Sequence, residues 1–156
     1  MTNRWRKTFM ASLVLACLCL STVSLLSHAA PPAVDACTLV TVAEVEQIVG
    51  QLKTPPQLLQ EAQTLTCDYV FVNAQEALAL WIFPGEALAR VKKLVHNQTM
   101  PVTGFGAEAF LYRDATLGYL ELWLKKGERV LQVALKASSA DEEKVKAIAQ
   151  KALSRL

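Results

Sequence analysis

Residues 119–136, YLELWLKKGERVLQVALK, decide the fold class of this chain. In both arms of the stretch, residues 119–125 and 129–136, aliphatic side chains recur at every second position, which is the period of a half-buried β-strand. The Lys126-Gly127-Glu128 segment between the arms is typical of a hairpin turn. We therefore expect an antiparallel hairpin with one buried face. The predicted inward side chains are Leu120, Leu122, Leu124, Leu131, Val133 and Leu135.

Two further segments on the N-terminal side show the same period. From Thr66 onward, Cys67, Tyr69 and Phe71 share one face of a predicted strand. A turn at 73–76 returns the chain into a second strand at 77–83. A strand at 108–113 then leads through a turn at 114–118 into the hairpin described above. The sequence therefore predicts about five strands, which are joined mostly by hairpins.

Three helices are predicted between and around these strands. Thr41 and Glu44 form a capping box at the start of a short helix that ends at Gly50. Residues 86–97 have an amphipathic pattern, and a second capping box, Ser139 with Glu142, opens a final helix. The polar stretch 57–64, which follows two prolines, predicts a loop or a weak half-turn.

The expected order of elements is α-β-β-α-β-β-β-α. Hairpin connections indicate antiparallel pairing, because parallel strands need long crossovers. We therefore expect an α+β fold: a two-layer domain with a mainly antiparallel sheet of about five strands and helices packed on one face.

The first 29 residues have the pattern of a signal peptide. Arg4, Arg6 and Lys7 precede the uncharged run 9–26, and Ser27 and Ala29 provide small residues for cleavage after Ala29. A single exported domain, residues 30–156, would remain.

Two alternatives to cleavage stay open. The apolar run is long enough to be retained as a membrane anchor. Residues 14–17 loosely resemble a lipoprotein cleavage box, so that a lipid on Cys17 would tether the chain. Contact with a membrane is expected only in these two cases.

The charge balance changes when the leader is removed. The remaining chain holds 13 basic and 14 acidic residues, and its only paired lysines are Lys92-Lys93 and Lys125-Lys126. Nucleic-acid binding depends on a surplus of positive charge, which is absent here. We therefore expect no nucleic-acid partner.

Cys37 and Cys67 are the two cysteines beyond the leader. Two cysteines in an exported chain predict one disulfide, since disulfides persist in oxidising compartments. Redox catalysis usually requires a Cys-x-x-Cys spacing, whereas these two residues lie 30 positions apart. A structural disulfide is the expectation.

The residues typical of catalysis are few. His96 is the one histidine beyond the leader, no Gly-x-Ser-x-Gly elbow is present, and the cysteines are assigned to the disulfide. We therefore expect no enzymatic activity, no metal and no cofactor. An enzyme would instead require a cavity that brings together at least two of Asp68, His96, Glu108 and Glu121.

Tyr119, Glu121 and Trp123 project from the same face of one predicted strand, opposite its leucines. If that face of the sheet is open, these three residues form a candidate binding surface. The alternative is that the aromatic side chains pack under a helix or a loop.

Three motifs resemble a broad family of small bacterial exported and lipoprotein envelope domains of unknown function. They are residues 36–41 (ACTLVT), 67–69 (CDY) and 102–110 (VTGFGAEAF). The resemblance covers most of the chain beyond the leader. It implies pairing of Cys37 with Cys67 and an envelope location, and it assigns no catalytic residues.

These observations favour an exported, non-enzymatic domain in the periplasm or outside the cell that binds a protein or a small envelope ligand. One alternative is a disulfide-stabilised inhibitor of an envelope-directed hydrolase, with loop 101–106 as its wedge. A second alternative is a small lipoprotein or a membrane-anchored, sensor-like module.

Overall fold

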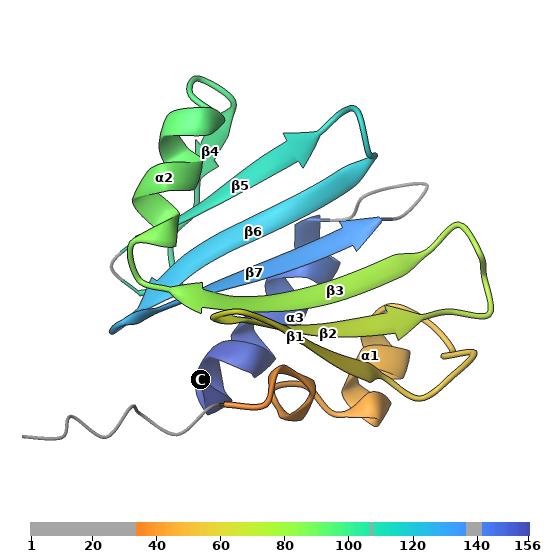
Figure 1. Ribbon diagram of the computed structural model, residues 1–156. Coiled ribbons are helices and arrows are strands. Elements are labelled where there is room, and N and C mark those ends of the chain that lie inside the picture. Colours follow the sequence, from red (N-terminus) through yellow and green to blue (C-terminus); the bar gives the residue numbers. More distant parts are fainter. Residues whose placement is uncertain (1–33, 107, 137–141) are drawn as a thin grey trace, which may run out of the picture. The chain divides into compact units, whose positions relative to one another are not determined.

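An antiparallel sheet forms the centre of the fold (Figure 1). The computed structural model describes residues 34–106, 108–136 and 142–156, all within the unit Ala33–Leu156. The predictions for the leader, for Cys17 and for the cap at Ser139 concern residues outside these ranges.

Seven strands are present in the described residues, in the spatial order β1-β2-β3-β7-β6-β5-β4, and each pairs antiparallel with its neighbours. The strands are β1 (Gln57–Glu61), β2 (Thr64–Val70), β3 (Ala77–Pro84), β4 (Thr99–Pro101), β5 (Glu108–Asp114), β6 (Tyr119–Lys126) and β7 (Arg129–Lys136). The helices are the 3-10 turn η1 (Ala36–Thr38), α1 (Val42–Ile48), α2 (Ala87–Leu94) and α3 (Glu142–Arg155).

The prediction of about five strands in the order α-β-β-α-β-β-β-α is wrong, because two edge strands were missed. β1 lies in the stretch predicted as a loop, and all five of its residues are exposed. An edge strand with both faces exposed has no alternation of burial for a sequence pattern to reveal. β4 has only three residues and pairs with β5 at the other edge.

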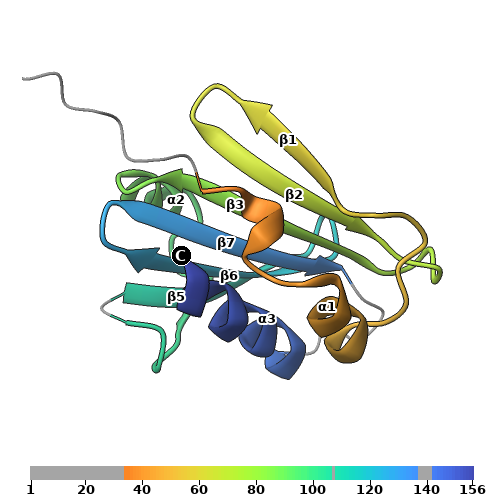
Figure 2. The same ribbon diagram turned by 90° about the horizontal axis from the view of Figure 1, so that it is seen from below.

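The expectation that the helices share one face is also wrong. α1 and α3 lie on one face of the sheet and α2 lies on the other (Figures 1 and 2). We call the face under α1 and α3 the inner face and the face that α2 contacts the outer face. An amphipathic pattern shows that a helix has a buried side but does not specify which face of a sheet it covers.

The predicted pattern of the β6–β7 hairpin is confirmed. Leu120, Leu122 and Leu124 lie in the inner core, together with the alternate residues Leu131, Val133 and Leu135 of β7. Six consecutive residues of β7, 130–135, are buried: the inner ones lie in the inner core, and the outer ones lie between the larger side chains of the strands that pair with β7 on both sides.

The C-terminal helix is tied to α1 by charge. Thr41 and Glu44 form the predicted capping box. Arg155 donates from Nη1 to Glu44 Oε2 (2.8 Å) and to the Leu39 carbonyl (2.9 Å), and from Nη2 to Glu44 Oε1 (2.9 Å). The Arg155 guanidinium holds the pKa of the Glu44 carboxyl well below its usual range.

None of the helices in the described ranges is long and apolar enough to cross a membrane.

The predicted disulfide between Cys37 and Cys67 is present. It joins η1 to β2 with a Cα–Cα distance of 5.0 Å, and Cys67 is fully buried. Tyr69, two residues further along β2, donates its hydroxyl to the Val40 carbonyl (3.3 Å), and burial raises the pKa of Tyr69 to about 12. Both contacts hold the segment before α1 against the inner face.

Replacing both cysteines, Cys37→Ala with Cys67→Ala, should lower the free energy of unfolding by about 3–4 kcal/mol, because the open chain gains conformational entropy when unfolded. Denaturant titration of the protein measures this change. Wild-type protein unfolded under reducing conditions provides the control and should match the variant closely. A loss of under about 1 kcal/mol would show that the disulfide contributes little to stability.

Candidate functional site

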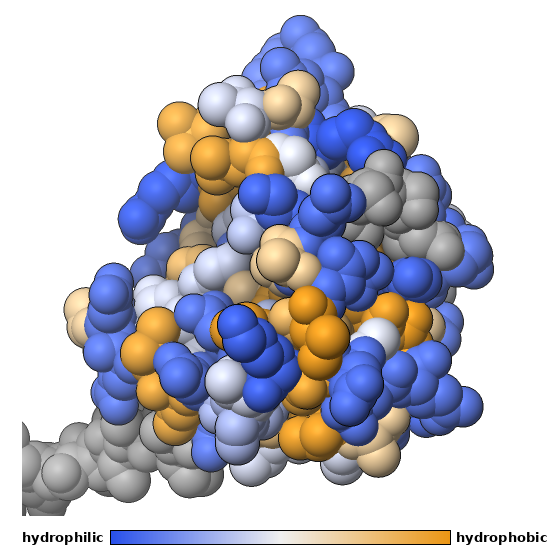
Figure 3. Space-filling view, turned by 90° about the vertical axis from the view of Figure 1, so that its right-hand side faces the viewer, coloured by the Kyte–Doolittle hydropathy of each residue, from blue (hydrophilic) through white to orange (hydrophobic). Residues whose placement is uncertain are grey.

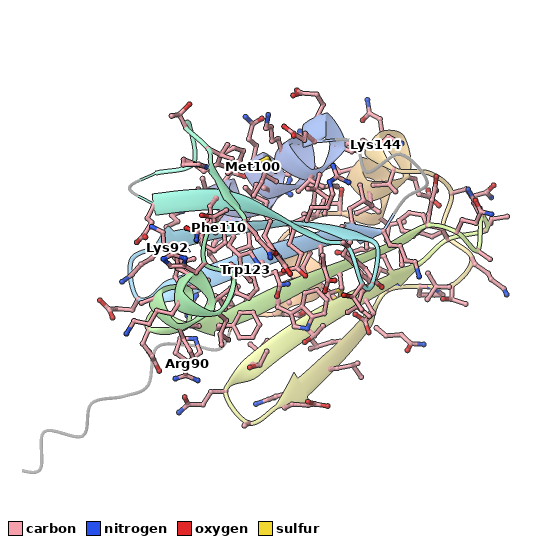
Figure 4. The ribbon with its side chains drawn as sticks, turned by 90° about the horizontal axis from the view of Figure 1, so that it is seen from above. Arg90, Lys92, Met100, Phe110, Trp123 and Lys144 are labelled. Carbon is pink, nitrogen blue, oxygen red and sulfur yellow. A yellow bond between two sulfur atoms is a disulfide. The ribbon has the colours of Figure 1, made fainter. Side chains whose placement is uncertain are left out.

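The outer face of the sheet is divided into two halves. Over one half, α2 packs Leu88 against Trp123, Phe110 and Val130. Trp123 stacks on Phe83, with ring centroids 5.4 Å apart, and on Phe110 at 6.5 Å. Figure 4 shows Phe110 and Trp123 side by side near the helix. This half is a small second core.

In the part of the chain that the structure describes, no helix packs over the remaining half (Figure 1). Strand register places Asp68, Ala79, Ala134 and Glu121 in one row across β2, β3, β7 and β6. Two carboxylates therefore lie in a row with only methyl groups between them. We call this region, from Asp68 to Glu121, the open half.

A cavity of about 320 Å³ lies in the open half. Its floor consists of the small side chains Ala77 and Ala79 and of backbone at Tyr69 and Leu78, whose side chains lie in the inner core. Larger side chains of β2, β3 and β6 form its walls. It is lined by Asp68, Tyr69, Val70, Ala77, Leu78, Ala79, Trp81 and Tyr119. The low floor exists because alanine, and no larger residue, occupies the outward positions of β3 between Val70 and Trp81.

Glu121 is held by neutral donors. Its Oε2 accepts from Trp123 Nε1 (2.7 Å) and from Gln132 Nε2 (2.9 Å). Burial raises the pKa of the Glu121 carboxyl, and these two hydrogen bonds only partly oppose the rise. The side chain is therefore fixed in position, without a cation to balance its charge among the described residues.

Asp68 is less constrained. Burial raises the pKa of its carboxyl, and no described residue donates to it or pairs with it. A carboxylate that loses water without gaining a partner destabilises the fold in its ionised form. Such a residue at the edge of a cavity is typical of a functional position.

Among the contacts of the described residues, one cation lies near this cavity: Lys136. It lies at the β6 end of the cavity, whereas Asp68 lies at the β2 end. Lys136 Nζ lies 5.8 Å from the centroid of the Tyr119 ring, within the range of a cation–π interaction. Register pairs Lys136 with both Tyr119 on β6 and Ala77 on β3, which places it beside the cavity.

The three residues of the predicted binding surface have different surroundings. Tyr119 lines the cavity, and Glu121 lies in the row of the open half. Trp123 is only 6% exposed, because α2 covers it, and its indole positions Glu121. Ala79 and Ala134 were not predicted as part of this surface, because a small side chain gives no signal until the strand register is known.

The residues named for the enzyme alternative are dispersed. Asp68 and Glu121 share a row, with two strands between them. Glu108 lies 2.6 Å from Lys92 in an ion pair at another hollow, and His96 is exposed beyond α2. Among the described residues there is no group of three or more His, Cys, Asp or Glu that could hold a metal ion.

Segment 101–106, the proposed wedge of the inhibitor alternative, is held in place by a buried side chain and by a backbone hydrogen bond. Phe105 is 2% exposed and joins the inner core, and the Val102 N–H donates to the Ala109 carbonyl (3.2 Å). Pro101 belongs to β4. The segment is therefore held closely against the sheet and has little free length to project.

Figure 3 shows the side of the molecule formed by the ends of the strands. Its hydrophobic residues form small groups that are separated by hydrophilic ones. No continuous apolar surface is visible on this side. The cavity of the open half is therefore the more specific feature, since it combines shape, aromatic rings and a carboxylate.

Comparisons with known proteins identify no family. No protein-family model matches the chain, and no curated protein is similar to it. Among solved structures, a crystal structure of a GTP binding regulator from Thermotoga maritima is similar over 74% of this chain and 89% of its own, with 13% sequence identity and a TM-score of 0.40. This distant likeness supports no inference about ligands.

Asp68→Asn should raise the midpoint of thermal unfolding slightly at neutral pH, because it removes an unpartnered, partly desolvated charge. Burial raises the pKa of Asp68 in the folded state. The gain should therefore shrink as pH falls through that raised pKa and vanish below the ordinary value of 3.8. Melting curves across this pH range test the sign, with Glu128→Gln in the β6–β7 turn as a control for net charge. A loss of stability at neutral pH would show that Asp68 has a stabilising partner.

Proposed function

We propose that the protein is an exported, non-enzymatic binding domain, periplasmic or extracellular, whose ligand occupies the cavity of the open half. The observation that carries this proposal is the cavity itself, between Trp81 and Tyr119 on the half of the outer face that α2 leaves uncovered. Concave sites with aromatic walls and a few polar groups are the usual places where proteins bind small molecules.

The packing of the outer face supports a binding role. A sheet face left to solvent normally has polar side chains at its outward positions. Here the cavity in the open half is instead lined by Ala77, Ala79, Trp81 and Tyr119, with Asp68 as its one carboxylate. Aromatic rings that remain accessible to solvent next to a partly desolvated charge contribute little to the stability of the fold, and they are typical of a ligand-binding site.

The rigidity of the cavity floor supports the same proposal. β3 lies between β2 and β7; it pairs with β7 along its whole length and with β2 over residues 77–82, which include the cavity floor. On the inner face of the sheet, the disulfide between Cys37 and Cys67 fixes β2. A site on such a scaffold is preformed, so that little conformational entropy is lost when a ligand binds.

The cysteine pair supports the proposed compartment. Cys37 and Cys67 are within bonding distance, and stable structural disulfides are rare in reducing compartments. The leader-like first 29 residues add an independent argument from sequence. Export and binding together define an envelope protein that recognises a ligand and does not transform it.

Ala79→Phe should abolish binding in the cavity, because a benzyl group would fill the floor between Asp68 and Trp81 while keeping a residue that strands favour. The measurement is the change in backbone amide NMR shifts on adding single probes from a panel: choline, n-butylamine, N-acetylglucosamine, 3,3-dimethylbutan-1-ol and octanoate. We expect at least one probe to shift the amides of β2 and β3 around the cavity in the wild type and not in Ala79→Phe.

Ala43→Phe, on the exposed side of α1, is the matched control and should bind as the wild type does. Shifts that cluster elsewhere, or no shift with any probe at millimolar concentration, would contradict the proposed site. Persistence of the same shifts in Ala79→Phe would also contradict it.

A further inference from the structure

We propose that the ligand group recognised in the cavity of the open half is an organic ammonium, quaternary or primary, held between the Trp81 and Tyr119 rings and the Asp68 carboxylate. This inference rests on the proposed function and specifies its chemistry. It is argued from the charges that surround the cavity, from the Tyr119 ring and from the size of the cavity.

The polar groups around the cavity attract positive charge. Asp68 lines it, and Glu121 lies in the same row across the sheet. Glu121 Oε2 already accepts two hydrogen bonds, and both donors, on Trp123 and Gln132, are neutral. Burial raises the pKa of both carboxyls, so a cation placed near them would recover electrostatic energy that the free protein lacks.

The Tyr119 ring already attracts an ammonium group in this structure. Lys136 Nζ lies 5.8 Å from its centroid. Aromatic rings attract cations through the negative charge of their π faces, and tryptophan does so more strongly than tyrosine. Trp81 provides a second ring on the same cavity, and the cation–π pair found among the described residues involves Tyr119 and not Trp81.

The size of the cavity restricts the ligand. About 320 Å³ lies at the lower end of the roughly 300–1,000 Å³ that is typical of small-molecule sites. A trimethylammonium or aminoalkyl group fits this space. An anion of the same size would meet the Asp68 carboxylate directly.

Choline and 3,3-dimethylbutan-1-ol form a matched pair for the test, because they differ only in a charged nitrogen that replaces a neutral carbon. NMR titration of the exported protein should give a dissociation constant for choline at least roughly tenfold lower than for the neutral alcohol. Nα-acetyl-lysine amide, in a parallel titration, distinguishes a free ammonium compound from a lysine side chain of a partner polypeptide. Tighter binding of either ammonium probe than of the neutral alcohol supports the inference.

Two charge variants then give changes of opposite sign. Asp68→Asn should weaken choline binding roughly tenfold, because it removes the facing charge. Lys136→Gln should strengthen binding a few-fold, since it removes a competing ammonium from the Tyr119 ring. Glu128→Gln and Lys93→Gln change the same charges at exposed positions away from the cavity and should leave the affinity unchanged.

If neither choline nor Nα-acetyl-lysine amide binds more tightly than the neutral alcohol, or if Asp68→Asn leaves the affinity for the tighter ammonium probe unchanged, the ammonium assignment is overturned. If a neutral or anionic probe still shifted the amides around the cavity, the proposed binding function would stand without this ligand class. If no probe shifted the amides around the cavity, both the proposed binding function and the ammonium assignment would be overturned.

Discussion

The pairing of β7 with β3 is the constraint on which the rest of the structure depends. It joins the N-terminal strands β1, β2 and β3 to the C-terminal hairpins, with Leu80 opposite Val133 in its middle. The paired residues are about 50 positions apart in the sequence, so this contact costs much more chain entropy than the hairpins do. Burial of six consecutive β7 residues on both faces of the sheet offsets that cost.

The same register builds the candidate site. It places Ala79 beside Ala134, and it thereby puts two methyl groups between the carboxylates of Asp68 and Glu121. α2 covers the aromatic half of the outer face and fixes Trp123, whose indole in turn holds Glu121. A shift of one residue in the β3–β7 pairing would turn Leu80 outward and Ala79 into the core, and the cavity would disappear.

Local features of the sequence were sufficient for the local structure. Alternation predicted the β6–β7 hairpin, Thr41 with Glu44 predicted the start of α1, and the cysteine count predicted the disulfide. The strand count failed because β1 is exposed on both faces and β4 is too short to show a period. The packing of α2 on the outer face of the sheet and the burial of Trp123 depend on tertiary contacts, which no local sequence pattern encodes.

The central claim is that the open half of the outer face is accessible in the folded protein. Hydroxyl-radical footprinting read by mass spectrometry tests it most directly, because the chain carries a tryptophan in each half of that face. We predict that Trp81 is oxidised several-fold faster than Trp123, which is only 6% exposed beneath α2. Equal protection of the two tryptophans would show that another part of the chain or a second molecule covers the cavity, and it would contradict the account.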